Sequence, residues 1–204
     1  KDGKAKQLGY LDDYSFLALG LCDFYEATFD RAALARAEGL TEIMLCEFWD
    51  DASGAFFYTG KSHERLISRT KPVFDASIPS GNAAATQLLL RFYHLTGKED
   101  YLKRAEKVLR SYYDAMENQP FGFAHLLCGL DLYLNKPKEI VVVGKRENAK
   151  TAELLNEIQS HYLPNKTLQL VAPDESLEQI SPLLVGKTQI DGKPTVYICE
   201  NFTC

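Results

Sequence analysis

The sequence has no block of basic residues and no long apolar segment. Its 204 residues include 23 Lys and Arg against 28 Asp and Glu, which gives a formal net charge of −5. An acidic chain without a basic cluster is poorly suited to nucleic acid, because that binding relies on cations at the phosphates. The apolar run 140–143 is far shorter than the ~20 residues that a membrane-spanning helix needs. We therefore expect neither nucleic acid nor a membrane as a partner.

Cysteine is scarce, and the five residues are an odd number. Cys22, Cys46 and Cys128 fall in apolar helical stretches, which favours reduced core thiols of a cytoplasmic protein over a disulfide scaffold. Cys199 and Cys204 follow the last apolar run of the chain, and two inert thiols are favoured over a metal or redox pair, since zinc needs four ligands. The chain begins at Lys1 without a Met or an apolar leader, so we read no targeting segment and expect missing upstream sequence.

Two further motifs are lacking. No two of the four histidines have metal-ligand spacing. The segment Gly144-Lys145-Arg146-Glu147 follows an apolar run but lacks the glycine pattern of a dinucleotide-binding turn. We therefore predict no metal site and no cofactor.

The composition is that of a folded protein, with 46% hydrophobic and 25% charged residues. Helical patterns occupy residues 11–134, and strand patterns occupy residues 139–204. The polar, Pro-containing junction 135–138 separates them. We therefore predict two domains, 1–136 and 137–204.

The first part contains an internal repeat with a shift of 68 residues. Residues 24–38 align with residues 92–106, and seven of the fifteen positions are identical. Each copy reads as a helix that is apolar nearly all round, a short polar turn, and a helix with a single apolar stripe. A third helix of the first kind follows at 121–134.

Helices that are apolar all round are buried, whereas a single stripe marks a helix with one face in water. The order inner, outer, inner, outer, inner predicts part of an α/α toroid or solenoid. Five helices do not close a ring, so we expect apolar inner-helix surface that further chain or another subunit would cover.

The second part reads as β-α-β-α-β. We predict strands at 139–144, 168–171 and 195–199, a helix at 148–161, and a short helix from Asp174 to Ile180. Strands separated by helices indicate a small parallel sheet. The predicted fold class is therefore mainly α, with a partial toroid followed by a small α/β segment.

The inner helices should start at one mouth of the array, because they run parallel to one another. The repeat places Asp12-Asp13 over Ser80-Gly81 at these ends, and Pro120-Phe121 holds the same place before the third inner helix. Free N–H groups and positive dipole ends suit anionic or hydroxyl-rich ligands. Helix capping is the favoured main role of Asp12 and Ser80, and ligand binding can coexist with it.

The long link 49–79 also leads to this mouth. Links of this length are usually functional or disordered. This one is rich in aromatic residues and contains a hairpin-like pair, 56–59 with 66–70, so we expect it to be ordered. Aromatic faces beside acidic, basic and amide groups suit a sugar-like ligand. A loop that merely plugs the mouth is the alternative.

Among the histidines, His125 lies one turn into the third inner helix. As a general acid or base it needs a partner carboxylate, which Asp12, Asp13 or Asp75 would supply. A satisfied core histidine is the favoured alternative. His94 and His161 are predicted to lie away from any catalytic site.

Several motifs of the chain together resemble a known family. In order, they are Tyr10-Leu11-Asp12-Asp13-Tyr14, Gly54-Ala55-Phe56-Phe57, Arg69 with Lys71, Asp75, Pro79-Ser80-Gly81-Asn82, Phe123-Ala124-His125-Leu126-Leu127 and Cys199-Glu200-Asn201-Phe202-Thr203-Cys204. This order resembles the C-terminal region of the YyaL-type proteins, the spermatogenesis-associated thioredoxin-domain family, over essentially the whole chain. The resemblance implies a thioredoxin-like domain, then a toroid of the six-hairpin glycosidase class, then an α/β segment. Because this sequence has no Cys-x-x-Cys, the thioredoxin-like domain and the rest of the toroid would be partners outside it.

The toroid of that family is similar to N-acylglucosamine 2-epimerases and related sugar enzymes. The resemblance implies a carbohydrate ligand and, if the protein is an enzyme, an epimerase, isomerase or glycosidase-like reaction. Such epimerases use two histidines, for which His125 and the loop residue His63 are the candidates. A non-catalytic module that serves the thioredoxin-like domain, or a helical scaffold, is the alternative. The candidate catalytic residues are Asp12, Asp13, Asp75 and His125, and the candidate substrate-binding residues are Arg69, Asn82, Phe57, Tyr58 and Phe123.

Overall fold

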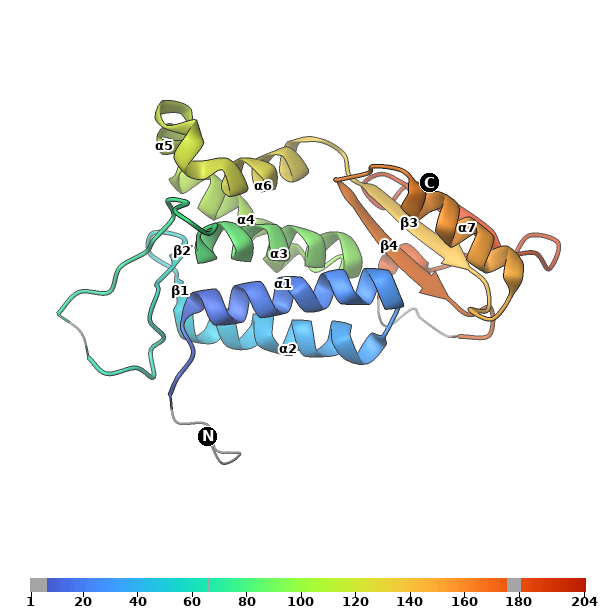
Figure 1. Ribbon diagram of the computed structural model, residues 1–204, viewed down its shortest axis with the longest axis horizontal. Helices are drawn as coiled ribbons and strands as arrows, with labels where there is room; N and C mark the ends of the chain where they lie inside the picture. The colour runs from blue at the N-terminus through green and yellow to red at the C-terminus, as the bar shows by residue number, and fades with distance from the viewer. Residues whose placement is uncertain (1–6, 66, 176–180) are drawn as a thin grey trace. The chain divides into compact units, whose positions relative to one another are not determined.

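The computed structural model describes residues 7–65, 67–175 and 181–204, and the chain divides into two compact units (Figure 1). The first unit comprises residues 1–90 and 100–133, and the second comprises residues 91–99 and 134–204. The protein is mainly helical with a small α/β part, in agreement with the predicted fold class at that level. The sequence did not indicate that Arg91–Glu99 groups with the C-terminal residues.

The helices of the first part follow the predicted order. They are α1 (Leu11–Thr28), α2 (Arg31–Phe48), α3 (Gly81–Thr96), α4 (Glu99–Ser111), the short α5 (Tyr113–Asn118), the 3-10 turn η1 (Pro120–Phe123) and α6 (Ala124–Leu134). The predicted third inner helix therefore starts as a 3-10 turn, where Pro120 occupies the first position. The helix α5 was not predicted, because its six residues are too few to show a periodic pattern.

The internal repeat is reproduced in the hydrogen bonds that end α1 and α3. Phe29 N–H donates to Tyr25 O over 2.5 Å, and Gly97 N–H donates to Tyr93 O over 2.7 Å. The Thr28 and Thr96 hydroxyls each donate back over 2.6 Å, to Phe24 O and Phe92 O. Phe29 and Gly97 both have positive φ, 57° and 72°. The two copies thus share one left-handed helix ending.

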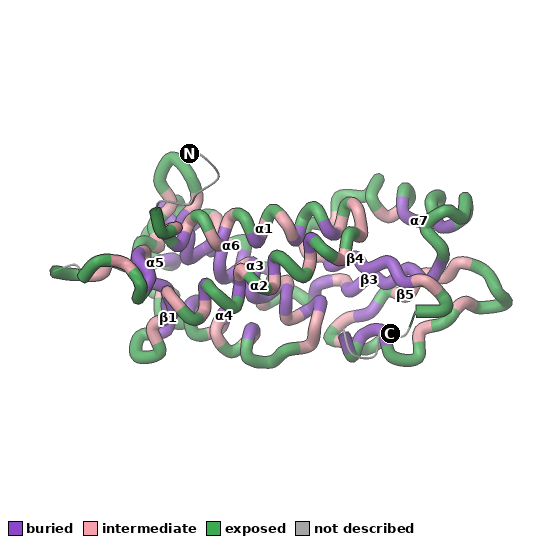
Figure 2. Tube along the Cα trace, turned by 90° about the horizontal axis from the view of Figure 1, so that it is seen from below, coloured by how far each residue is buried: buried purple, intermediate pink, exposed green. Residues whose placement is uncertain are grey.

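The predicted inner helices α1 and α3 differ in burial, as Figure 2 shows along the chain. Leu88, Leu89 and Leu90 point in three directions around α3, and all three are fully buried. On α1, by contrast, Leu17 is 56% exposed and Phe24 is 51% exposed. The prediction of a helix buried all round is therefore right for α3 and wrong for α1 in this chain. The face of α1 that carries Leu17 and Phe24 is the uncovered apolar surface that the sequence predicts.

The link between α2 and α3 begins with a hairpin, in a different place from the predicted one. The strands β1 (Trp49–Asp50) and β2 (Ala55–Phe56) pair in antiparallel fashion. The turn between them closes through Gly54 N–H, which donates to Asp50 O over 2.9 Å, and Gly54 has a φ of 72°. Of the predicted pairing of 56–59 with 66–70, the structure retains the hydrogen bond from Tyr58 N–H to Thr70 O, 2.8 Å. Residue 66 lies outside the described residues.

The second unit is built on a three-stranded sheet. Its elements are β3 (Lys138–Val143), α7 (Ala149–Ser160), β4 (Lys166–Val171), the 3-10 turn η2 (Pro182–Leu184) and β5 (Thr195–Cys199). The strand order is β4-β3-β5, in which β4 runs parallel to β3 and β5 runs antiparallel to it. The prediction of a parallel sheet was therefore wrong for the third strand. Of the short helix predicted over 174–180, residues 176–180 lie outside the described residues.

The antiparallel direction of β5 follows from the route of the chain after β4. A parallel neighbour would require a crossover that returns the chain to the starting edge. Instead, Asp191 and Gly192, both with positive φ, turn the chain close to the carboxyl end of β3. Thr195 consequently pairs with Val143, and β5 runs back along β3 to Cys199 beside Glu139.

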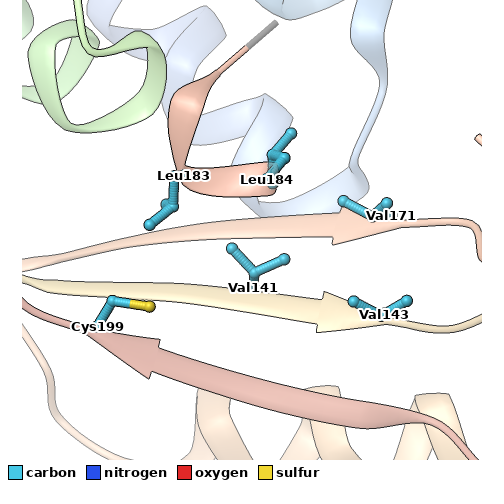
Figure 3. Close-up of a cluster of buried hydrophobic side chains, with 6 residues drawn as sticks. All are labelled: Val141, Val143, Val171, Leu183, Leu184 and Cys199. Carbon is cyan, nitrogen blue, oxygen red and sulfur yellow. The ribbon is translucent and has the colours of Figure 1, made fainter. Parts of the chain in front are cut away.

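Alternate residues of the sheet form a buried cluster on one face (Figure 3). Its members are Val141, Val143, Val171, Leu183, Leu184 and Cys199, with Tyr197 and Phe202 packed against them. The turn η2 supplies both leucines and covers this face. Ile140 and Val142 point to the opposite face, in keeping with the two-residue period of a strand.

Candidate functional site

The helices α1, α3 and α6 begin at the same end of the first unit, next to β1 and β2 (Figure 1). We call this end, with its residues 10–13, 57–58, 75, 80–82 and 123–125, the mouth. Apart from Arg69, which contacts Phe57, the candidate residues predicted from the sequence lie in these ranges. Some of them hold the fold, and others keep unused polar atoms.

The Pro-Ser-Gly-Asn segment builds the start of α3 residue by residue. The Ser80 hydroxyl accepts from Ala83 N–H over 3.2 Å and so caps α3, as predicted. Gly81 leaves room for α1, because a Cβ at this position would lie 2.2 Å from Asp12 Oδ1. The fully buried Asn82 side chain holds the link: it accepts from Phe56 N–H over 2.8 Å and donates to Phe56 O and Pro72 O over 2.9 and 2.8 Å.

Asp75 connects the link to two helices. Its Oδ1 accepts from Ser80 N–H over 2.9 Å, and its Oδ2 accepts from His125 N–H over 2.8 Å. Asp75 N–H in turn donates to Gly122 O over 2.7 Å. The structure thus brings the predicted pair Asp75 and His125 together, but the carboxylate contacts the backbone of His125. Both carboxylate oxygens are occupied by helix N–H groups, as in a helix cap.

Asp12 does not cap its own helix, contrary to the favoured interpretation of the sequence. Tyr10 precedes α1, and the exposed Asp13 accepts from Tyr10 N–H over 2.7 Å. The Asp12 carboxyl group instead faces Gly81 at the start of α3. Burial raises the pKa of Asp12, the neighbouring Asp13 carboxylate raises it further, and the nearby backbone of Gly81 opposes both effects.

Three polar atoms at or near the mouth have no hydrogen-bond partner among the described residues. They are Oδ1 of Asp12, Nε2 of His125 and Nε2 of His63, and all three are buried. The other ring nitrogen of His63 accepts from Gly60 N–H over 3.0 Å, which fixes the ring. Buried polar atoms are otherwise almost always paired. These atoms are therefore the unused donors and acceptors of the site.

The aromatic residues of the mouth already have ring partners. Tyr58 stacks on Tyr10 with a centroid distance of 4.9 Å, and Tyr10 also lies against His63 at 5.1 Å. Phe123 is buried and contacts Phe74 edge to face at 5.5 Å. Burial raises the pKa of the Tyr58 hydroxyl, and the charges of Asp12 and Asp13 add to the effect. Tyr58 therefore lies within the electrostatic field of the acidic pair.

The two basic residues of the link enclose Phe57. The Arg69 guanidinium lies 4.1 Å and the Lys71 ammonium 4.4 Å from the centre of the Phe57 ring. Arg69 also donates to Thr59 O, and Lys71 donates to Asp50. The ion pair with Lys71 and further hydrogen bonds hold the pKa of Asp50 well below its usual range. The structure thus employs Arg69 and Phe57 in ordering the link.

Sequence reasoning missed two features of the molecule. Tyr10 was not proposed as part of the mouth, although the Tyr-Leu-Asp-Asp motif that contains it was noted. In the second unit, His94 was set aside, yet its Nδ1 lies 2.8 Å from Oε1 of the fully buried Glu139. The signal that was available is Glu139 itself, a charged residue near the start of a strand that continues as an apolar run.

The described part of the chain holds no group of three or more His, Cys, Asp or Glu side chains arranged to bind a metal ion. None of its helices combines the length and the apolar character that crossing a bilayer requires.

Comparison with known proteins shows that the chain is similar to a part of several longer proteins. No family model matches it. It is similar to spermatogenesis-associated protein 20 of Homo sapiens, 31% identical over 199 residues that cover 96% of this chain and 25% of the relative. The protein of the same name from Rattus norvegicus is 32% identical over the same shares. An uncharacterised protein of Caenorhabditis elegans is 25% identical over 205 residues, 100% of this chain and 28% of the relative.

The chain spans about a quarter of the length of the curated relatives that it matches. The identity extends over nearly the whole chain, including both units, and is not confined to one motif. Over nearly its whole length, the chain is therefore similar to the C-terminal part of spermatogenesis-associated protein 20.

Proposed function

We propose that the first unit is part of an α/α toroid of the six-hairpin glycosidase class, and that its mouth binds a carbohydrate. Support for the toroid comes from the repeated helix ending at Phe29 and Gly97 and from the common starting end of α1, α3 and α6. The exposed Leu17 and Phe24 add to it, since neighbouring helices of a ring would cover them.

The observation that carries the binding proposal is the contrast between satisfied and unsatisfied groups at the mouth. Each polar side-chain atom of Asn82 and Asp75 already forms a hydrogen bond, either to the link or to the start of a helix. The Asp12 carboxyl and the His125 imidazole each keep a buried atom without a partner among the described residues. An unpaired buried polar atom costs about 1–3 kcal/mol. A ligand rich in hydroxyl groups would remove this cost, because a hydroxyl both donates and accepts.

The same two groups are chemically suited to act on a sugar as well as to bind it. Because the pKa of Asp12 is raised, its carboxyl group retains a proton at higher pH than an ordinary aspartate does. If both groups reach one bound sugar, a carboxyl group of this kind and an imidazole supply the acid and the base for proton transfer at a sugar carbon or oxygen. Asp12 and His125 are therefore the residues that we assign to chemistry, and Asp13 contributes charge.

The test is a binding screen of the chain against monosaccharides, disaccharides and sugar phosphates by saturation-transfer NMR. We expect saturable binding that weakens about tenfold in Asp12→Asn and in His125→Gln, which corresponds to the loss of about 1.4 kcal/mol. The fold should survive the second change, because Asp75 contacts only the backbone of His125.

His161→Gln is the matched control, because His161 is exposed on the second unit and bonds only within its own helix end. It should leave binding unchanged. Absence of saturable binding to all three ligand classes would contradict the proposal and favour a module that acts only by docking other domains. Binding that is indifferent to both mouth variants would place the ligand elsewhere.

A further inference from the structure

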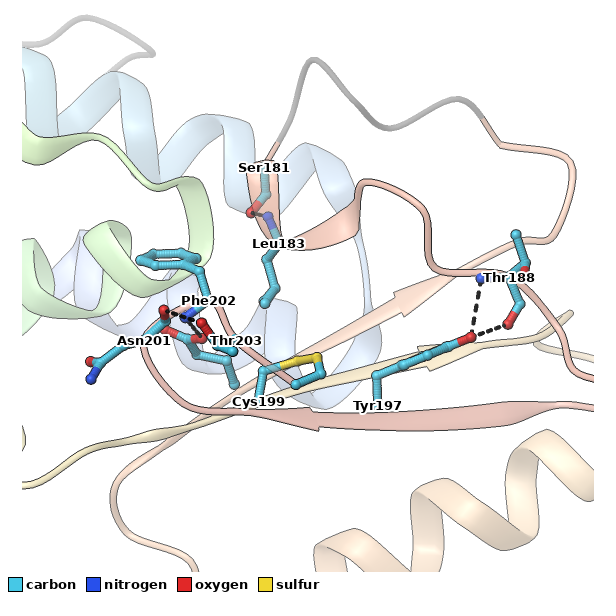
Figure 4. The surroundings of a disulfide bond; sticks show 10 residues. Ser181, Leu183, Thr188, Tyr197, Cys199, Asn201, Phe202 and Thr203 are labelled. Carbon is cyan, nitrogen blue, oxygen red and sulfur yellow. Dashed lines mark hydrogen bonds between the residues drawn. A yellow bond between two sulfur atoms is a disulfide. The ribbon is translucent and has the colours of Figure 1, made fainter.

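The chain ends in a tight turn that follows β5. Glu200 and Thr203 exchange two backbone hydrogen bonds of 2.9 and 3.1 Å. The residues between them, Asn201 and Phe202, have positive φ of 50° and 60°, as in a type I′ turn. Cys199 and Cys204 flank this pair, with their Cα atoms 4.1 Å apart, and form a disulfide (Figure 4). The sequence-based preference for two unpaired thiols was therefore wrong, because a type I′ turn directs both side chains to one side.

The two sulfur-bearing residues differ in their environment. Cys199 is 1% exposed and belongs to the buried cluster beside Val141 and Leu183 (Figure 3). Cys204 is exposed. Thiol–disulfide exchange requires an attacking thiolate to reach one sulfur atom in line with the bond. Only the Cys204 side of this disulfide is open to such an attack.

The turn also completes a buried contact between Glu139 and His94. Phe202 N–H donates to Glu139 Oε2 over 2.7 Å, and Glu139 Oε1 lies 2.8 Å from His94 Nδ1. The Phe202 ring stacks on His94 with a centroid distance of 6.2 Å and meets Tyr93 edge to face at 5.3 Å. The position of Phe202 thus decides whether the second oxygen of a buried carboxylate is satisfied by the protein or exposed to water.

That position is costly for the backbone. A residue other than glycine in the left-handed region costs about 1–2 kcal/mol, and less for asparagine, so Phe202 bears the larger cost. The two backbone hydrogen bonds between Glu200 and Thr203 and the disulfide hold the turn in place despite this cost. The other three cysteines, Cys22, Cys46 and Cys128, are not joined in a disulfide, as is usual in proteins of reducing compartments, where a disulfide is mostly transient.

We propose that Cys199–Cys204 is a reversible redox site that a dithiol reductant opens at Cys204, and that its state controls the contact of Phe202 with Glu139. One thiolate of the dithiol attacks Cys204 Sγ, so a mixed disulfide forms there and the Sγ–Sγ bond breaks. Cys199 leaves as a thiolate and takes up a proton. The second thiol of the reductant then displaces Cys204, which is protonated in turn. The dithiol is oxidised to a disulfide, and two protein thiols form for the two electrons transferred.

The experiment treats the native chain with dithiothreitol and follows it by thiol alkylation with mass spectrometry and by hydrogen–deuterium exchange. We expect two additional alkylated thiols under native conditions and at least tenfold faster amide exchange in 199–204. Exchange in the buried strand 140–143 should stay slow. Reoxidation with a disulfide of the reductant's class should restore the protection.

Cys204→Ser should reproduce the reduced state without reductant, and Cys46→Ser, at an exposed free thiol, should change neither readout. The proposal is overturned if the disulfide resists reduction until the chain is denatured, or if it does not form in air. It is equally overturned if reduction leaves exchange in 199–204 unchanged, or if reduction unfolds the strand 140–143 together with the turn.

Discussion

At the scale of single residues, the mouth contains polar groups with two different roles that the sequence does not distinguish. Asp75 and Asn82 look like ligand-binding residues by type, yet their side chains bond to backbone groups of the link and the helix starts. Asp12 and His125 retain unused buried atoms. A sequence shows which residues can bind, but only the path of the backbone shows which of them are already engaged.

Asn82 provides the prediction at this scale. Replacement of Asn82 by Ala leaves Phe56 N–H, Phe56 O and Pro72 O without their partner. Because each orphaned buried group costs about 1–3 kcal/mol, we expect the free energy of unfolding to fall by about 3–4 kcal/mol in urea titrations. Asn118→Ala is the control, since Asn118 donates only to Asp114 O on an exposed helix and its loss should cost less than about 0.5 kcal/mol. A loss below 1 kcal/mol for Asn82→Ala would show that the link does not depend on this amide.

At the scale of elements, the five longer helices before residue 135 and the strands β3, β4 and β5 were predictable, because their periodicity and repeat appear in the sequence itself. The direction of β5 was not, since it depends on a turn at Asp191 and Gly192 rather than on the strand. The same holds for the β1–β2 hairpin, whose two-residue strands are too short to give a pattern. The disulfide likewise depends on turn geometry that spacing alone does not reveal.

The repeated helix ending gives the prediction at this scale. Gly97 has a φ of 72°, and a Cβ there would lie 2.5 Å from Pro182 Cγ. Gly97→Ala should therefore lower the free energy of unfolding of the second unit, measured by thermal denaturation, by at least ~1–2 kcal/mol, the cost of an alanine in the left-handed region. Gly20→Ala, in the interior of α1 where no atom lies within 4 Å, should be neutral or stabilising by up to about 1 kcal/mol. Equal effects of the two substitutions would contradict the left-handed ending.

At the scale of the whole molecule, two observations agree with the proposal that the first unit is part of a larger helical ring. Leu17 and Phe24 are exposed, and the chain matches about a quarter of the length of its relatives. The first unit presents an apolar helix face that fits the continuation of a helical ring, while the mouth lies at the ends of the helices. The two units also carry separate chemistry: unsatisfied polar groups at the mouth in one, and a disulfide-bonded turn in the other.

The central claim is that Asp12 and His125 bind one carbohydrate together, and a double-mutant cycle tests it most directly. Dissociation constants of one sugar would be measured by calorimetry for the wild type, Asp12→Asn, His125→Gln and the double variant. If both side chains contact the same ligand, we predict a coupling energy of at least about 0.5 kcal/mol. Strictly additive losses, or a double variant that binds as tightly as the wild type, would contradict the claim.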